Sequence, residues 1–128
     1  MLTTSALPSS STILVVDDEP DIVLTLRDLL EADGHQIDVA STGGTALECV
    51  KHHSHGVVIL DVKLPDMDGL LVLEQMTKAV PGLPIIILSC YTTLDAVTGS
   101  LEEQGAFAYL HKPINRSEIR TTVRQALK

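Results

Sequence analysis

Short apolar runs, rich in β-branched residues, recur along the chain and predict β-strands. They span residues 13–16, 37–39, 57–60, 85–88 and 107–110. Each run is short enough for a strand that is buried on both faces, which is the pattern of a parallel sheet. We therefore expect five strands.

The segments between these runs have the apolar period of a helix. Ile22, Leu26 and Leu29 follow this period after the first run, and the last segment repeats it up to the end of the chain. Pro20 stands near the start of the first helical segment and Gly34 just past its end, where these residue types favour helix termini. Alternating strands and helices predict an α/β fold, a (βα)5 doubly wound domain with right-handed crossovers.

Polar residues follow four of the five predicted strands. Asp17 and Asp18 end the first, Asp61 the third and Ser89 the fourth, and Lys112 comes shortly after the fifth. In open α/β sheets the carboxyl ends of the strands form one edge, where ligands bind. With a parallel five-stranded sheet in the flavodoxin-like order 2-1-3-4-5, these side chains converge.

Three carboxylates at one edge repel one another and call for a cation. Mg²⁺ is expected, because it takes one or two carboxylates and fills its other positions with water and phosphate oxygens. A carboxylate nucleophile, Mg²⁺, a lysine and a hydroxyl together suit phosphoryl transfer. No GxxxxGK[ST] or GxGxxG motif is present, so the phosphoryl group must come from another molecule.

Three motifs resemble those of the receiver domains of two-component response regulators. They are VVDDEP at residues 15–20, DVKLPDMDG at 61–69 and GAFAYLHKP at 105–113. Their order and spacing make the match specific. The resemblance extends over residues 12–128 and implies a phosphorylation switch with self-phosphorylation and self-dephosphorylation only, not a turnover enzyme.

The resemblance also implies roles for residues of the acidic edge. Asp61 accepts a phosphoryl group from a phosphohistidine of a sensor histidine kinase or a histidine phosphotransfer protein. Asp18, Asp61 and the backbone carbonyl of Lys63 ligate Mg²⁺, and Asp17 holds a metal-bound water.

The remaining implied roles concern phosphate binding and switching. Ser89 matches the switch hydroxyl, Tyr109 the switch aromatic residue and Lys112 the phosphate-binding lysine. The peptide bond between Lys112 and Pro113 is expected to be cis, which proline permits.

Several other polar residues have simpler interpretations. Asp66 and Asp68 lie in a turn rich in Pro and Gly, where Asp binds its own backbone. Three histidines close the second helix near Cys49. We interpret them as residues that interact favourably with the helix dipole, and not as ligands of a transition metal. These are His52, His53 and His55.

A basic band runs along the last helix, formed by Arg116, Arg120, Arg124 and Lys128. It is either a solvated face or a surface for a second copy or an output domain, formed together with an acidic fourth helix.

Composition narrows the class of protein. Lys and Arg number 9 against 17 Asp and Glu, so the formal net charge of −8 repels nucleic acid, and no direct binding to it is expected. Cys49 and Cys90 have no CxxC spacing, and no apolar run approaches the roughly 18 residues of a membrane span, so we expect a cytoplasmic protein without membrane contact. Residues 1–11 are expected to form a flexible tail ahead of one domain, residues 12–128.

Two other functions use similar parts. A haloacid dehalogenase-type phosphatase also forms an aspartyl phosphate, but its nucleophile lies in a DxD motif on the first strand. A flavodoxin-like flavin protein usually offers aromatic stacking partners, whereas this chain has no Trp and two Tyr.

Overall fold

The computed structural model describes residues 12–90 and 105–128. The expected flexible tail, residues 1–11, lies outside the described residues, as does the expected fourth helix. The five strands are β1 (Thr12–Val16), β2 (Gln36–Ala40), β3 (Val57–Asp61), β4 (Ile85–Cys90) and β5 (Ala108–Lys112). All pairings are parallel and the strand order is β2-β1-β3-β4-β5, which confirms the predicted topology.

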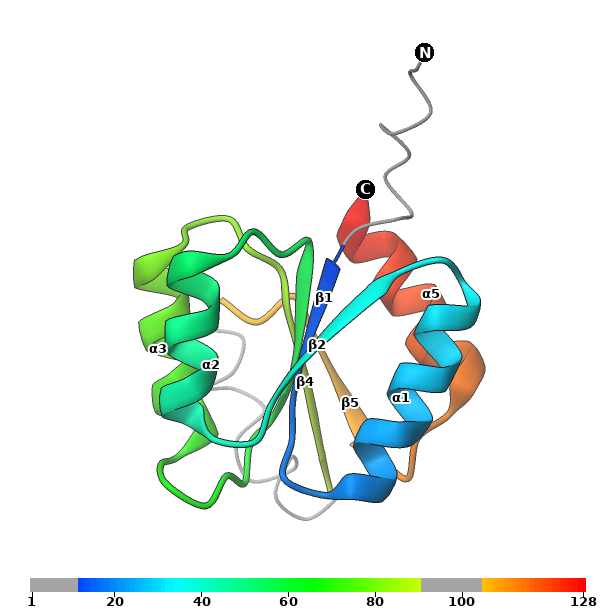
Figure 1. The fold of residues 1–128 in the computed structure, drawn as a ribbon, viewed down its shortest axis with the longest axis horizontal. Helices are drawn as coiled ribbons and strands as arrows, with labels where there is room; N and C mark the ends of the chain where they lie inside the picture. The colour runs from blue at the N-terminus through cyan, green and yellow to red at the C-terminus, as the bar shows by residue number, and fades with distance from the viewer. Residues whose placement is uncertain (1–11, 91–104) are drawn as a thin grey trace.

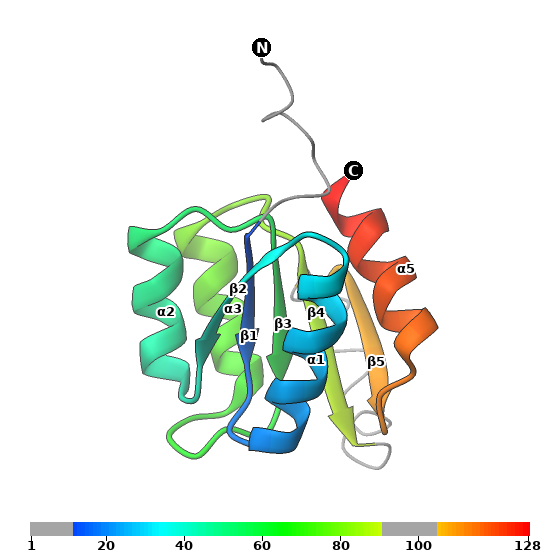
Figure 2. The same ribbon diagram turned by 45° about the vertical axis from the view of Figure 1, so that its right-hand side comes forward.

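Helices cover both faces of the sheet. They are α1 (Pro20–Ala32), α2 (Gly43–His52), α3 (Gly69–Ala79) and α5 (Arg116–Leu127). Helices α2 and α3 lie on one face, and α1 and α5 on the other (Figures 1 and 2). Each face has its own aliphatic cluster, and every residue of β3 is buried because this strand is central to both.

The helix ends follow local sequence. Pro20 is at the first position of α1, and Gly34 adopts a φ of 94° just past its end, as predicted. The side chains of Thr42, Asp68 and Asn115 accept backbone N–H groups at the starts of α2, α3 and α5. In the part of the chain that the structure describes, no helix has both the length and the apolar character needed to cross a membrane.

The fifth strand differs from its predicted bounds of 107–110. Phe107 precedes it and is exposed, and β5 continues through His111 to Lys112, which pairs with Cys90. Because β5 is only partly buried, polar residues can continue the strand beyond its apolar run. The apolar pattern therefore did not predict the last two residues of β5. Lys112 is therefore the last residue of β5 and does not lie in the loop after this strand.

Candidate phosphorylation site

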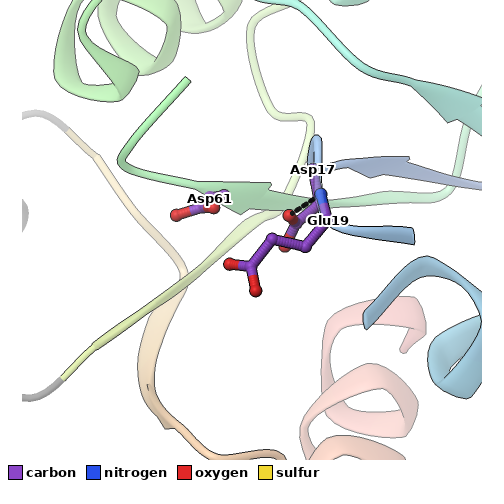
Figure 3. A group of neighbouring side chains, drawn as sticks. All are labelled: Asp17, Glu19 and Asp61. Carbon is purple, nitrogen blue, oxygen red and sulfur yellow. Dashed lines mark hydrogen bonds between the residues drawn. The ribbon is translucent and has the colours of Figure 1, made fainter. Parts of the chain in front are cut away.

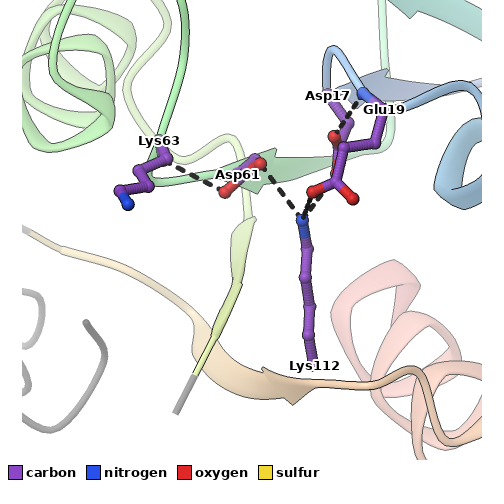
Figure 4. A network of polar contacts seen from close by, with 5 residues as sticks. All are labelled: Asp17, Glu19, Asp61, Lys63 and Lys112. Carbon is purple, nitrogen blue, oxygen red and sulfur yellow. Dashed lines mark hydrogen bonds and ion pairs between the residues drawn. The ribbon is translucent and has the colours of Figure 1, made fainter. Parts of the chain in front are cut away.

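Oppositely charged side chains from three strands meet at the carboxyl edge of the sheet (Figure 4). Asp17 directly follows β1, Asp61 is the last residue of β3 and Lys112 is the last residue of β5. Asp17 and Asp61 are buried, with exposed fractions of 2% and 4%. The sequence-predicted convergence of these three residues is therefore observed.

The Lys112 ammonium group is the hub of this network. Its Nζ lies 3.3 Å from Asp17 Oδ2, 2.8 Å from Glu19 Oε1 and 3.2 Å from Asp61 Oδ2. Burial alone would lower the pKa of Lys112, but the hydrogen bond to Glu19 and the charges of Asp17 and Asp61 outweigh it. The net result is a pKa above the ordinary lysine value, so Lys112 stays charged.

Both buried carboxylates are held in the same way. The Glu19 N–H donates to Asp17 Oδ1 at 2.9 Å, and the Lys63 N–H donates to Asp61 Oδ1 at 3.0 Å. In each case the amide lies two residues after the acid, a local turn that Asp favours. One oxygen of each carboxylate is thus fixed by backbone, and the other faces Lys112.

Three carboxylates share this single lysine. Asp17, Glu19 and Asp61 each offer an oxygen atom, and these atoms lie within 4.8 Å of one another (Figure 3). Burial and then the neighbouring Asp61 charge raise the pKa of Asp17, despite the opposing hydrogen bond from Glu19 and the Lys112 charge. A compact set of oxygen donors with excess negative charge suits a hard divalent cation such as Mg²⁺.

Glu19 was not among the residues predicted from sequence. Its signal is its place as the third acid of the DDE run, directly before Pro20. Asp18 is exposed and is not one of the three clustered acids. The assignment of Asp18 and the Lys63 carbonyl as metal ligands stays a prediction.

The expected switch residues lie on the two strands beside Asp61. Ser89 is buried in β4, one residue after Leu88, which is in register with Asp61. Tyr109 on β5 is half-buried against the aliphatic cluster under α2 and α3. The Lys112–Pro113 peptide is cis, as the resemblance implied.

The acids in the loop after Asp61 have different partners. Asp68 accepts the Leu70 N–H at 2.9 Å and so binds its local backbone, as predicted. The prediction for Asp66 was wrong in its main partners, because Asp66 accepts the N–H groups of Gly43 and Gly44 at the start of α2. The sequence alone did not place that helix beside the loop.

The histidine segment also differs from expectation. Helix α2 ends at His52, and the His55 side chain, 1% exposed, lies 2.8 Å from Asp38 Oδ2 through its Nε2. His55 is therefore a partner of β2 with a buried side chain, whereas His52 ends the helix and His53 caps it, its N–H donating to the Cys49 carbonyl. Among the described residues, the one group of three or more side chains close enough to share a metal is the acidic group, so a histidine–Cys49 metal site gains no support.

The basic band of α5 is partly occupied by an internal contact. Arg120 Nε lies 3.1 Å from Asp33 Oδ2 at the end of α1, whereas Arg116 and Arg124 are exposed. The acidic residues of the expected fourth helix are Asp95, Glu102 and Glu103, and they lie outside the described residues.

Comparison with known proteins agrees with this fold and site. The family model for the response regulator receiver domain matches residues 13–124. Sporulation initiation phosphotransferase F of Bacillus subtilis is 35% identical over 115 residues, which cover 90% of this chain and 92% of that protein. The crystal structure of a CheY-like receiver domain protein from Methanospirillum hungatei superposes with a TM-score of 0.85 at 32% identity, covering 92% and 94% of the two chains.

The fold and the site define a receiver domain, and this chain belongs to the response regulator receiver domain family of two-component signalling. Nothing in the comparisons supports the haloacid dehalogenase-type phosphatase.

Some relatives are much longer than this chain. The transcriptional regulatory protein ZraR of Escherichia coli is 32% identical over 115 residues, and the chain spans about a quarter of its length, 26%. Because such relatives are named as transcriptional regulators, the expectation of no nucleic-acid binding is not supported.

Proposed function

We propose that this domain accepts a phosphoryl group on Asp61 in a Mg²⁺-dependent reaction and changes conformation in response. The observation that carries the proposal is the buried Asp61 carboxylate, which lies 3.2 Å from Lys112 and beside two further acids. The donor is a phosphohistidine on a sensor histidine kinase or a histidine phosphotransfer protein, the partner that receiver-domain membership implies.

The chain supplies most of the groups that this transfer requires. A carboxylate oxygen of Asp61 bonds to phosphorus as the bond from phosphorus to the donor imidazole breaks. Lys112 neutralises charge on the transferred group, and the Ser89 hydroxyl donates a hydrogen bond to it. Asp18, Asp61 and the Lys63 carbonyl would hold Mg²⁺ and Asp17 would hold a metal-bound water, and the ion would supply further charge neutralisation.

The response passes through the strands beside Asp61. Ser89 moves toward a phosphoryl oxygen, Tyr109 turns inward, and the surface containing Arg116, Arg120 and Arg124 meets a second copy or an output domain. Amide shifts on phosphorylation test this coupling. Shifts that stay confined to the loop after Asp61 contradict it.

Treatment with phosphoramidate and Mg²⁺ tests the acceptor. We expect one phosphoryl group per chain, located on Asp61 by mass spectrometry, and none in Asp61→Asn. Asp68→Asn is the matched control, since it removes a nearby acid from the same loop and should leave modification intact. Phosphate found on Asp66 or Asp68 contradicts the assignment.

A further inference from the structure

The loop between β3 and α3 is tied to a helix far from it in sequence. Asp66 Oδ1 accepts the Gly43 N–H at 2.8 Å, and Oδ2 accepts the Gly44 N–H at 3.0 Å. The first amides of a helix have no partner within the helix, and its N-terminus favours negative charge. One carboxylate thus satisfies two amides of α2, which begins beside this loop (Figure 1).

The contact is close as well as polar. A Cβ atom at Gly43 would lie 2.5 Å from Met67 Cγ and 2.7 Å from Val72 Cγ2, so a larger residue there would force the loop and α3 away. The cap of α2 itself is separate, since Thr42 Oγ1 accepts the Thr45 N–H at 3.1 Å. Asp66 is therefore an anchor for the loop in addition to the ordinary helix cap.

The same loop holds Asp61 in place. Its first turn supplies the Lys63 N–H to Asp61 Oδ1 at 3.0 Å. Its base is closed by the Gly69 N–H, which donates to the Val62 carbonyl at 2.8 Å, and by pairing of Lys63 with Asp68. The base of the loop thus adjoins the reacting carboxylate, and Asp66 anchors its tip to α2.

We propose that Asp66 is a positioning residue that anchors this loop to the start of α2 and thereby places the Lys63 backbone beside Asp61. The inference rests on the proposed function, in which that backbone helps to bind Mg²⁺. Hydrogen bonds from Gly43 and Gly44 lower the pKa of Asp66, so the anchor carries a full negative charge at neutral pH.

Asp66→Ala and Thr42→Ala separate positioning from helix capping. Both remove acceptors from the start of α2, but the Thr42 hydroxyl makes its hydrogen bonds to Thr45 within the helix and not to the loop residue Asp66. We expect Asp66→Ala to bind Mg²⁺ about 10-fold more weakly and to accept phosphate more slowly from phosphoramidate, as for residues that orient metal ligands. Thr42→Ala should lose comparable thermal stability and keep wild-type Mg²⁺ affinity. Wild-type Mg²⁺ affinity in both variants overturns the proposal.

Asp66→Glu separates position from charge. It keeps the negative charge, but its side chain is one methylene longer, so it can keep both amide bonds only if the loop shifts, and its Mg²⁺ affinity should fall toward that of Asp66→Ala. If Gly43 and Gly44 lose hydrogen-exchange protection in Asp66→Glu while Mg²⁺ affinity stays at the wild-type value, the effect is one of charge and the proposal is wrong.

Hydrogen exchange also distinguishes this inference from the proposed function. In Asp66→Ala the amides of Lys63 and Gly69 should exchange faster than in wild type. If wild type neither binds Mg²⁺ nor accepts phosphate, the proposed function fails, and this exchange measurement still decides the anchor. Unchanged protection of Lys63 and Gly69 overturns it.

Discussion

The charged side chains at the two ends of β3 have different numbers of partners. At the carboxyl end, Asp61 shares one ammonium group with Asp17 and Glu19. Just before the amino end, buried His55 has a single carboxylate partner, Asp38. His55 Nδ1 is buried without a hydrogen-bond partner in the structure, so the geometry favours a ring with its hydrogen on Nε2, donated to Asp38.

This difference separates a structural polar pair from a binding site. At the His55 end, among the residues that the structure describes, the charge of Asp38 has one partner, the Nε2 atom of His55, and no further acid shares that partner. Three acids around one lysine, two of them buried, leave excess negative charge, which costs stability until a cation binds. We therefore expect substitutions at the His55 end to change stability alone, and substitutions at the Asp61 end to change Mg²⁺ affinity.

The largest effect is expected for Asp18→Ala, which removes a proposed direct ligand. Mg²⁺ affinity should fall about 100-fold, at the upper end of what loss of a supporting residue causes. Mg²⁺ titration measures this affinity. The same titration of Glu19→Ala tests whether Asp18 or Glu19 is the ligand, and Asp21→Ala, at an exposed acid, is the control for loss of charge. A greater loss in Glu19→Ala than in Asp18→Ala would assign the ligand to the clustered acids.

The next effect is on stability at the other end of β3. His55→Ala leaves a cavity and removes the partner of Asp38, and should lower the free energy of unfolding by about 2 kcal/mol without changing Mg²⁺ affinity. Chemical denaturation measures this, with exposed His52→Ala as the matched control. A weakened Mg²⁺ affinity in His55→Ala would break the distinction between the two ends.

Asp17→Asn should stabilise the protein when Mg²⁺ is absent. Because the pKa of Asp17 is raised in the folded state, its favourable contribution is present below the unfolded pKa and is lost as pH rises through the folded pKa. Asparagine does not ionise, so the variant does not lose this contribution as the pH rises, and its side-chain oxygen still accepts the Glu19 N–H. We expect a gain of about 1 kcal/mol at pH 7 that fades as pH falls below about 4.

Urea denaturation at several pH values measures the Asp17→Asn effect. Adding Mg²⁺ should stabilise wild type more than the variant, because the variant binds the ion less well. A variant that is less stable than wild type at pH 7 without Mg²⁺ would show that the acidic cluster carries no excess charge cost.

The smallest effect is expected for Lys63→Asn. Its side chain is exposed at the acidic end, where it adds positive charge near phosphorylated Asp61. Exposed charges interact by about 1 kcal/mol or less, so the aspartyl phosphate should decay only about twofold faster. Loss of phosphate after donor removal, at constant Mg²⁺, gives the rate. Exposed Lys51→Asn is the control, and slower decay in Lys63→Asn would refute the effect.

The fold could be predicted from sequence because its signals are local. Apolar runs and helical periods mark the elements, and Pro20 and Gly34 mark the ends of α1. Placement of polar residues directly after strands then identified Asp17, Asp61 and Lys112 as neighbours, since parallel strands share one carboxyl edge. The boundary of β5 was missed, because a half-buried edge strand lacks a continuous apolar pattern.

Only the tertiary structure decided the contacts between residues that are far apart in the sequence. Glu19 reaches Lys112 across 93 positions, Asp66 reaches Gly43 across 23 and His55 reaches Asp38 across 17. The sequence determined the strands and helices and their order, because burial and backbone preference act over a few residues. The path of a loop depends on how whole helices pack against the sheet. That packing therefore also decides which amide or charged group an acidic residue of the loop contacts.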